Sequence, residues 1–275
     1  KVKLERGVLY SFKVAAANKG GKSFTTETLC ALYNSDSEYA DNIIIIDGFH
    51  RLSSPAIRDN VFEQGFDFDD DPGVSLGPTA GWVGRQLCYN RDRIGIEDES
   101  GLGWSGDEFT GMFIAGNDRN HVRTHAEAIQ ASGSYNIASC SSEALETGKI
   151  DLSRYKLADM VLGLERNDGH SLKYYKTFPL LIRDQLRAFT KRGGRLLVSG
   201  AYIGSDMTAP EEQLFLKETL KCSYAGSHTS LNDFIYGMNT TIPYHNAINE
   251  EHYAATKHDA FTPHGHAYAA LCYNN

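Results

Sequence analysis

The sequence lacks long apolar runs and clusters of basic residues. No stretch approaches the roughly 20 apolar residues that a membrane-spanning helix needs. No basic run is longer than Lys191-Arg192, and the formal net charge is −8. A protein that binds the nucleic-acid backbone concentrates Lys and Arg on one face. The sequence therefore predicts neither a transmembrane segment nor nucleic-acid binding.

Cysteine is scarce, and no metal motif is present. The chain has five cysteines, none of them in a C-x-x-C pair, so no thiolate zinc site is predicted. Their odd number leaves at least one thiol unpaired and the other pairings open. Residues 67–71 hold four aspartates, but they lack calcium-loop spacing and are interpreted as a solvated acidic loop. His264 and His266 lack a third ligand and are interpreted as surface histidines. No metal and no cofactor is predicted.

The most regular stretch is residues 177–206. Pro179 suits the first turn of a helix, and Ile182, Leu186 and Phe189 then fall at helical spacing. Gly193-Gly194 predicts the end of the helix through positive φ angles. Residues 196–198 follow as a short apolar strand. A helix followed by a buried strand is half of a βαβ unit, which indicates a parallel sheet.

Residues 1–33 have the pattern of a β-hairpin. Tyr10, Phe12 and Val14 alternate with less apolar residues, residues 18–21 predict a turn, and a second strand returns over residues 23–33. The pattern L-x-x-G-x-x-Y-x-F-x-V-x-A-x-N-x-x-G-x-S resembles the last two strands of a fibronectin type III domain. The earlier strands of such a module are absent. Because an isolated hairpin is marginal in water, it must pack on the next domain or on an upstream segment that completes the module.

The remainder alternates between strands and helices. Residues 34–41 are predicted as a linker, and residues 42–275 as one α/β domain with a long irregular insertion at about 50–110, including a helix over 79–90. The other strands are expected at 43–46, 112–115, 135–138 and 158–164, and the other helices at 120–132, 141–147 and 211–220. This alternation predicts a three-layer, mostly parallel sheet of flavodoxin-like type.

Several strings recur together in one family. They are IIIIDGFHR, IAGN, SCSSE and GGRLLVSGAYIGSD. In these strings the chain resembles multidomain, exported Bacteroidetes proteins labelled "xanthan lyase" or golvesin C-terminal-like, in which a fibronectin-like module precedes an α/β domain. The resemblance implies a secreted, periplasmic or cell-surface protein linked to polysaccharide or cell-wall material. The lyase label is not supported by the sequence, because polysaccharide lyases commonly use toroids or β-helices. The chain begins Lys1-Val2-Lys3 and is expected to be the trimmed part of something longer.

Polar residues follow the predicted strands, where ligands bind in open α/β sheets. A hydrolase could be assembled from Cys140 or Ser141 as nucleophile, His121 or His125 as base, and Asp47 or Glu165 as the group that orients the base. Asn117 could donate a hydrogen bond to an oxyanion. The binding residues predicted at these ends are Phe49, Glu165, Ser199, Tyr202 and Asp206.

Each candidate has a structural alternative. Free cysteines such as Cys140 are commonly buried and inert. The turn from Ser199 to Tyr202 lacks the G-x-S-x-G pattern, so its glycine can serve close packing instead. Trp82, Tyr89 and Trp104 could stack on sugar rings or form a small core of the insertion. The sequence thus predicts a hydrolase-like domain acting on polysaccharide or cell-wall glycan, with a non-catalytic carbohydrate-binding or surface-interaction module as the alternative. Catalysis itself stays open.

Overall fold

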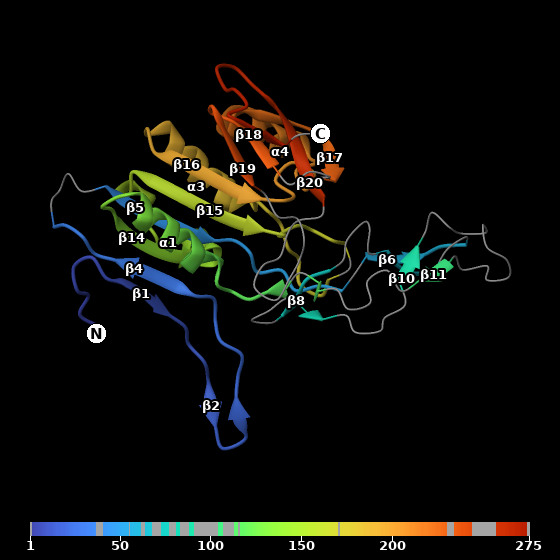
Figure 1. The fold of residues 1–275 in the computed structure, drawn as a ribbon, viewed down its shortest axis with the longest axis horizontal. Coiled ribbons are helices and arrows are strands. Elements are labelled where there is room, and N and C mark those ends of the chain that lie inside the picture. The colour runs from blue at the N-terminus through green and yellow to red at the C-terminus, as the bar shows by residue number, and fades with distance from the viewer. Residues whose placement is uncertain are drawn as a thin grey trace.

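The computed structural model is built on one six-stranded mixed sheet with the strand order β1-β4-β14-β5-β15-β16 (Figure 1). The described residues are 2–36, 41–54, 56–61, 64–67, 73–76, 81–82, 88–90, 104–106, 113–114, 116–169, 171–229, 234–243 and 257–273. Mixed α/β content is therefore confirmed, with parallel strands at the centre of the sheet.

Four parallel strands form that centre. They are β14 (Asn136–Ser141), β5 (Asn42–Asp47), β15 (Leu157–Gly163) and β16 (Arg195–Gly200). Asp47 lies in register with Ser141 on one side and with Val161 on the other. The carboxyl ends of three adjacent strands therefore reach the same edge of the sheet.

The N-terminal hairpin extends this sheet instead of standing apart. β4 (Leu29–Leu32) pairs antiparallel with β1 (Leu9–Phe12) and also with β14. The hairpin tip, with β2 (Ala17–Asn18) and β3 (Gly21–Lys22), reaches away from the sheet (Figure 1). The packing partner that the hairpin was expected to need is therefore β14.

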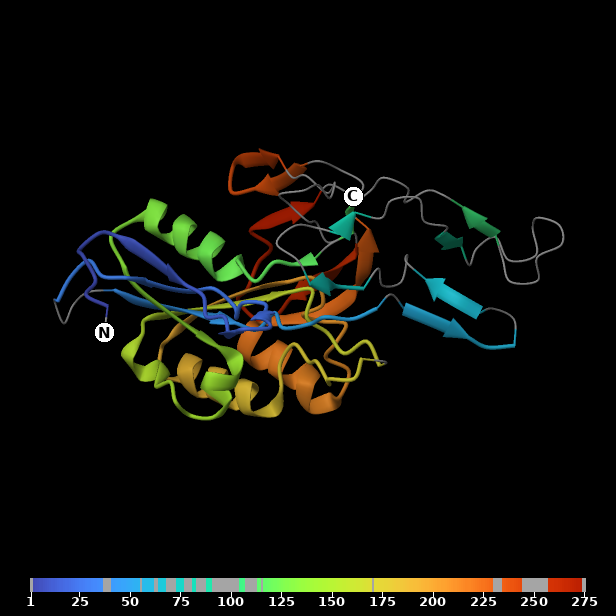
Figure 2. The same cartoon turned by 90° about the horizontal axis from the view of Figure 1, so that it is seen from below.

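Helices cover both faces of the sheet (Figure 2). α1 (His121–Ser132) lies on one face. The opposite face carries α2 (Ser142–Glu146), the short 3₁₀ turn η2 (Leu152–Arg154), α3 (Leu180–Lys191) and α4 (Pro210–Phe215), which continues as the π-helical segment η3 (Leu216–Leu220). The three layers follow from the need to bury both faces of a parallel sheet.

The isoleucine run of β5 is the centre of the core. Ile44, Ile45 and Ile46 are fully buried. Ile44 and Ile46 pack with residues of α2 and α3, whereas Ile45 packs against α1 with Val122. A strand buried on both faces reads as a continuous apolar run, and each such side chain contributes about 1.5–3 kcal/mol on burial.

The helix and strand predicted over residues 177–200 are confirmed. Ile182, Leu186 and Phe189 are buried on α3. Gly193 has φ +89°, as the end of the helix requires, and a Cβ at Gly194 would lie 2.4 Å from the Phe189 ring. The glycine pair thus both turns the chain and admits the close approach of β16.

The insertion contains short strands outside the main sheet, and it departs from the prediction at its expected helix. The helix expected over 79–90 is wrong, because β9 (Gly81–Trp82) and β10 (Cys88–Asn90) are short strands. β12 (Phe113–Ile114) pairs with β9 outside the main sheet. The other short strands are β6 (Ala56–Asp59), β7 (Gln64–Asp67), β8 (Ser75–Leu76), β11 (Trp104–Gly106) and β13 (Gly116–Asn117). Residues 68–71 of the acidic cluster, and the side chains of Trp82, Tyr89 and Trp104, lie outside the described part.

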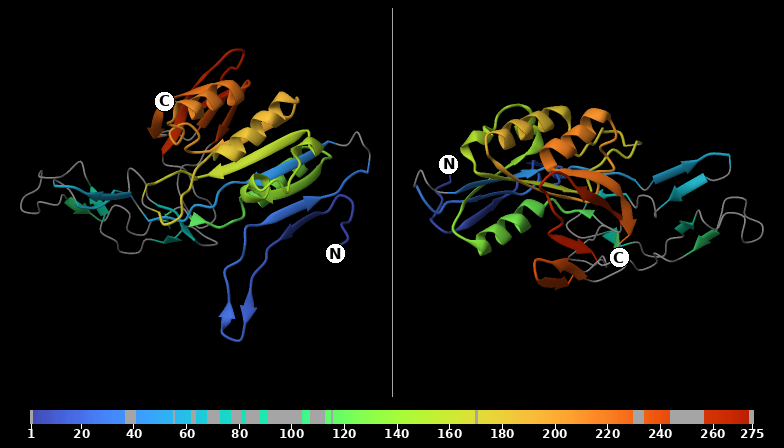
Figure 3. Two further views of the ribbon diagram at one scale, coloured as in Figure 1. Left: turned by 180° about the vertical axis from the view of Figure 1, so that it is seen from behind. Right: turned by 90° about the horizontal axis from the view of Figure 1, so that it is seen from above.

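The C-terminal part forms small antiparallel sheets (Figure 3). β17 (Cys222–Thr229) pairs with β20 (Lys257–Pro263), and β18 (Phe234–Gly237) pairs with β19 (Thr240–Pro243) and β21 (Leu271–Tyr273). The Asp259 N–H donates to Ala201 O over 3.0 Å, which fastens β20 to the turn after β16. Within the described residues, no helix is long and apolar enough to cross a membrane.

Candidate functional site

The candidate site lies at the carboxyl ends of β5, β14 and β15. The loop after β5 carries His50, the residue after β14 is Ser142, and the loop after β15 begins with Leu164 and Glu165. Because the three strands are parallel neighbours, these loops emerge side by side. This is the edge at which open α/β sheets bind ligands.

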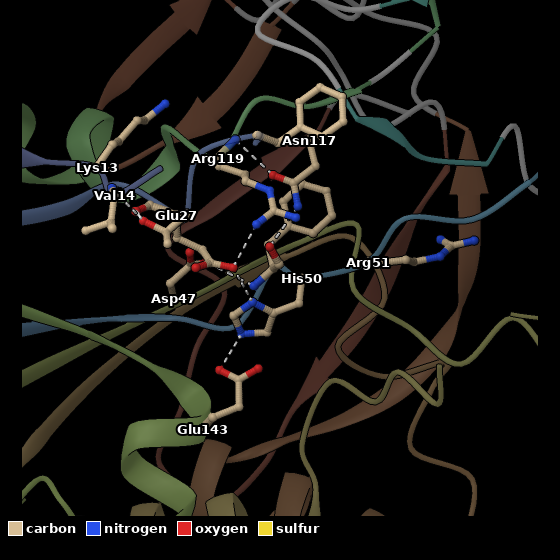
Figure 4. A network of polar contacts seen from close by, with 12 residues as sticks. Lys13, Val14, Glu27, Asp47, His50, Arg51, Asn117, Arg119 and Glu143 are labelled. Carbon is tan, nitrogen blue, oxygen red and sulfur yellow. Dashed lines mark hydrogen bonds and ion pairs between the residues drawn. The ribbon is translucent and has the colours of Figure 1, made fainter. Parts of the chain in front are cut away.

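His50 is the centre of a polar network (Figure 4). Its Nε2 lies 2.9 Å from Ser142 Oγ, and its Nδ1 lies 3.4 Å from Glu27 Oε1. The Glu143 carboxylate approaches the same Nε2 at 3.5 Å. The imidazole therefore stands between a serine hydroxyl on one ring nitrogen and a carboxylate on the other.

Glu27 reaches the site because the N-terminal hairpin is part of the sheet. It lies just before β4, where the Thr28 N–H donates to Arg119 O over 2.9 Å. The Arg119 guanidinium donates to Glu27 Oε1 over 3.2 Å. The hydrogen bond with His50 contributes most to lowering the pKa of Glu27, to about 2. Glu27 is therefore ionised and fixed between two cationic groups.

The backbone of the His50 loop is held from three directions. Glu165 Oε2 accepts the N–H groups of His50 and Arg51, both over 2.8 Å. Asp47 Oδ1 accepts the Phe49 N–H over 3.1 Å. The Asn117 side-chain amide donates to Phe49 O over 2.8 Å. These bonds fix the loop that places the imidazole.

Arg51 anchors the far side of the same loop. Its side chain is fully buried, donates to Leu164 O over 3.1 Å and lies 3.7 Å from Asp168 Oδ2. A buried guanidinium is tolerated only when charge and hydrogen bonds compensate it. The loops after β5 and β15 are therefore locked together.

The electrostatics of the site favour a protonated imidazole. Burial alone would lower the pKa of His50, but Glu27, Asp47, Glu143 and Glu165 together outweigh it and raise the pKa to about 9. Burial raises the pKa of Asp47 to about 6 and that of Glu165 to about 7. Three groups that can exchange protons between acidic and alkaline pH thus share one site.

A pocket opens on this network. Its volume is about 260 Å³, and its lining includes His50, Ser142 and Glu143. The loop before α3 also contributes Lys173 and Tyr174 to the lining. Ser142 is 9% exposed, so its hydroxyl is largely shielded from bulk water. The pocket gives a small substrate group a route to the serine and the imidazole.

Four of the predicted site residues are brought together, although not in every expected role. Asp47, Phe49, Asn117 and Glu165 all lie around the His50 loop. Asn117 is fully buried, and its Oδ1 also accepts the Arg119 N–H over 3.0 Å. Because both ends of its amide are engaged, Asn117 holds the loop and is not placed as an oxyanion donor.

The predicted nucleophile Cys140 is not in the site. Its side chain packs in the core on the α2 and α3 side of the sheet, with Ile46 and Leu145. Burial raises the pKa of its thiol to about 12. A thiol with such a pKa is not a nucleophile at neutral pH. Cys140 is therefore a buried, inert cysteine, which is the structural alternative given above for this residue.

The two histidines predicted as bases lie on α1, and neither contacts the serine. His125 Nδ1 is 2.7 Å from Oδ2 of Asp159, a buried residue in the middle of β15. His121 packs against the Phe49 ring with centroids 5.1 Å apart, and its Nε2 lies 3.7 Å from Asp118 Oδ1. His125 is thus placed as the hydrogen-bond partner of a buried carboxyl group. Burial lowers the pKa of His121.

Of the remaining predicted residues, three lie farther along the sheet edge and Ser141 ends β14 at the site itself. Ser199 is in β16, in register with Val161 of β15. Tyr202 and Asp206 follow β16 and line a second pocket. Ser141, the other nucleophile candidate, accepts the Ala144 N–H over 3.4 Å as the N-cap of α2. Among the described contacts, no imidazole bonds Cys140, Ser141 or Ser199.

The sequence reasoning missed His50, Ser142, Glu27 and Glu143. His50 comes three residues after the end of β5, and Ser142 directly follows β14. Their position after strands is a signal that could have found them. Glu27 had no such signal, because only the pairing of β4 with β14 brings it to this edge. Within the described residues, no group of three or more His, Cys, Asp or Glu side chains is arranged to hold a metal ion.

No family model matches the chain, and neither a curated protein nor a solved structure matches it.

Proposed function

We propose that the site is the centre of a serine hydrolase that cleaves acyl groups from polysaccharide or cell-wall glycan. The observation that carries the proposal is the 2.9 Å contact between Ser142 Oγ and His50 Nε2, with Glu27 on the other ring nitrogen at 3.4 Å. A hydroxyl, an imidazole and a carboxylate in this order form the arrangement that activates a serine nucleophile.

The steps follow from these contacts. Neutral His50 takes the Ser142 proton at Nε2 while Oγ bonds to the carbonyl carbon of an acyl ester in the pocket. The C–O bond to the sugar then breaks, and the leaving alcohol takes the proton from His50. Water next attacks the acyl-enzyme, gives its proton to His50 and releases the acid, and that proton returns to Ser142. Glu27 orients the ring and stabilises the imidazolium in both halves.

The pKa of His50 sets the pH range of this activity. Because that pKa is about 9, the imidazole is mostly protonated at neutral pH and becomes a base as the pH rises. The hydrolase is therefore most active under alkaline conditions. A bound acyl group excludes water from the pocket. This further desolvation of His50 disfavours the imidazolium and lowers its pKa.

The fold and the sequence resemblance support the wider setting. In chain order, the four parallel strands occupy the sheet as second, first, third and fourth, which agrees with the first four positions of the flavodoxin-like order 2-1-3-4-5 and supports a fold of that type. The fibronectin-like hairpin pattern and the strings shared with exported Bacteroidetes proteins support a secreted, periplasmic or cell-surface location. The glycan substrate rests on that resemblance, and the reaction type rests on the geometry.

The proposal is tested with 4-nitrophenyl esters and acetylated bacterial glycans at pH 9. We expect wild-type protein to release nitrophenol or acetate and Ser142→Ala to lose at least about 100-fold of the rate. Ser153→Ala is the matched control, because Ser153 is exposed on η2, away from the pocket. Phenylmethanesulfonyl fluoride should label Ser142, as read by peptide mass spectrometry. Equal rates for wild type and Ser142→Ala, with no label on Ser142, exclude the hydrolase.

The alternative is a non-catalytic carbohydrate-binding module, and one observation favours it. Tyr174 lines the mouth of the pocket and remains 69% exposed. An exposed aromatic ring beside a polar pocket suits stacking on a sugar. Saturable glycan binding that Tyr174→Ala weakens, together with an inert Ser142, would support this module.

A further inference from the structure

A second polar pocket lies beside the hydrolase site, around Arg166. Its volume is about 240 Å³, and its lining comes from the loop after β15, the turn after β16 and strand β17. The lining residues are Arg166, Asn167, Tyr202, Ser205, Asp206, Tyr224 and Ser227. Three separate elements thus converge on one small cavity.

The acceptors of this pocket are already satisfied within the protein. Asp206 Oδ1 accepts the Asn167 N–H over 3.0 Å, and its Oδ2 accepts the Thr177 N–H and hydroxyl, both over 2.9 Å. Lys176 Nζ lies 3.8 Å from the same carboxylate. The negative charge at this wall is therefore compensated.

The neighbouring carboxylate of Asp259 is satisfied as well. Its Oδ2 accepts the backbone N–H groups of Gly204 and Ser205, over 2.7 Å and 2.6 Å. Its Oδ1 accepts the Ser227 hydroxyl over 2.8 Å. No acceptor of these two aspartates needs a cation from outside.

In contrast to these acceptors, several hydrogen-bond donors that line the pocket have no acceptor among the described residues. Arg166 stacks its guanidinium over the Tyr202 ring, 4.8 Å from the centroid. This stacking uses the face of the group and leaves the N–H edge for hydrogen bonds. Among the described residues, neither that edge, nor the Asn167 side-chain nitrogen, nor the Ser205 hydroxyl is engaged in a hydrogen bond or ion pair. The pocket therefore offers donors without acceptors.

From this imbalance we infer that the pocket binds an oxyanion group, a carboxylate or a phosphate, carried by a small hydroxylated ligand. Guanidinium edges pair with such groups through two parallel hydrogen bonds. Asn167 and Ser205 add neutral donors, and Tyr224, whose hydroxyl lies 2.8 Å from Ser227 Oγ, adds a wall that can contact ligand hydroxyls. The site is independent of the hydrolase chemistry, since Ser142 and His50 take no part in it.

Isothermal titration calorimetry at low ionic strength tests the inference. The probes are D-glucuronate, D-glucose 6-phosphate and inorganic phosphate, with D-glucose as the uncharged probe. We expect saturable binding of at least one oxyanion and much weaker binding of D-glucose. A preference for glucuronate identifies a sugar acid as the source of the group. A preference for either phosphate identifies a phosphate ligand.

Variants link the binding to Arg166. Arg166→Gln should weaken oxyanion binding about tenfold or more. The affinity of Arg166→Lys should lie between those of wild type and Arg166→Gln, because lysine keeps the positive charge but cannot form the two parallel hydrogen bonds of a guanidinium. Arg187→Gln is the matched control, since Arg187 also lies over an aromatic ring, Phe215, but on α3. Thermal unfolding of each variant checks that it is folded. Unchanged binding in folded Arg166→Gln, or equal binding of D-glucose and D-glucuronate, overturns the inference. Because no turnover is measured, failure of ester hydrolysis leaves this result unaffected.

Discussion

His50 and Ser142 are 92 residues apart in the chain, yet the imidazole Nε2 lies 2.9 Å from the serine Oγ. The contact exists because β5 and β14 are parallel neighbours whose ends are in register at Asp47 and Ser141. Each residue follows its strand closely, so the sheet itself positions the pair.

The first prediction concerns the pH dependence of stability. The pKa of His50 is raised to about 9 from an ordinary 6.5, so the folded state holds this proton more tightly than the unfolded state. The resulting stabilisation is fully present below about pH 6.5 and is lost as the pH rises through about 9. At about 1.4 kcal/mol per pKa unit, it amounts to at most about 3 kcal/mol. Urea unfolding of wild type and His50→Gln should show a difference in stability that shrinks between pH 6 and 9.5. A constant difference contradicts the raised pKa.

Glu165 gives a prediction in a lower pH range. Burial raises its pKa to about 7 from 4.5. Between about pH 4.5 and 7 the carboxyl ionises in the unfolded state but stays protonated in the folded state, so stability falls progressively over this range. Glu165→Gln keeps an oxygen that can accept the His50 and Arg51 N–H groups. We expect this variant to be more stable than wild type at pH 8, by about 3 kcal/mol, and similar near pH 5. Loss of stability at both pH values would mean that the ionised carboxylate is needed in the fold.

Two glutamates show which site residues can be predicted from the sequence and which cannot. Glu165 was predicted at the site because it follows an apolar strand, and the alternation of strands and helices is visible in the sequence. Glu27 was not predicted, because its place depends on the pairing of β4 with β14, a contact between segments more than 100 residues apart. Hydrophobic patterns reveal which segments are strands but not which antiparallel strand extends the sheet. For the same reason the hairpin was recognised, but its partner was left open.

Cys140 illustrates the other limit of the sequence. It was expected just after a strand over residues 135–138, but β14 extends to Ser141 and contains it. The side of the sheet to which such a residue points depends on the register of one residue. We expect iodoacetamide to leave native Cys140 unmodified and to label the exposed Cys272, as read by peptide mass spectrometry. Cys140→Ala should lower stability by about 1 kcal/mol and leave ester hydrolysis unchanged. Rapid labelling of Cys140 in the folded protein contradicts its burial.

Gly163, at the end of β15, lies against the Phe49 ring of the His50 loop. It has φ +49°, and a Cβ at this position would lie 2.4 Å from the Phe49 ring. Gly163→Ala should therefore cost about 1–2 kcal/mol for the left-handed backbone and about 1–3 kcal/mol more for the clash with Phe49. Because Phe49 precedes His50, the rate of ester hydrolysis should also fall. Gly148→Ala is the control, with φ +69° and open space around its Cβ, and should show the backbone cost alone. Equal effects of the two variants contradict the packing role of Gly163.

The pair of His125 and Asp159 is predicted to serve stability and not reaction. Asp159 is 1% exposed, and His125 approaches one of its oxygens at 2.7 Å. Removing the histidine leaves a buried carboxylate without its partner, which costs about 3 kcal/mol. His125→Ala should lower the free energy of unfolding by about this amount, and Asp159→Asn should restore part of it in the double variant. Hydrolysis rates measured at a temperature where each variant is folded should stay at the wild-type value. A large rate loss in folded His125→Ala would place this histidine in the reaction after all.

The last prediction concerns Glu27 as the residue that positions His50. Its carboxylate is the strongest single contributor to the raised pKa of the imidazole. Glu27→Gln keeps a side chain of the same size, removes that charge and should lower the pKa of His50. The alkaline rise of the hydrolysis rate should then move to lower pH, while the maximal rate falls because the imidazolium formed in each half-reaction is less stabilised. A role in stability alone would lower the amount of folded protein without moving the pH profile. Glu127→Gln is the control, since Glu127 pairs with Arg123 over 2.7 Å on the exposed side of α1. An unchanged pH profile in folded Glu27→Gln would separate Glu27 from the imidazole and leave Ser142 and His50 as a pair without an orienting carboxylate.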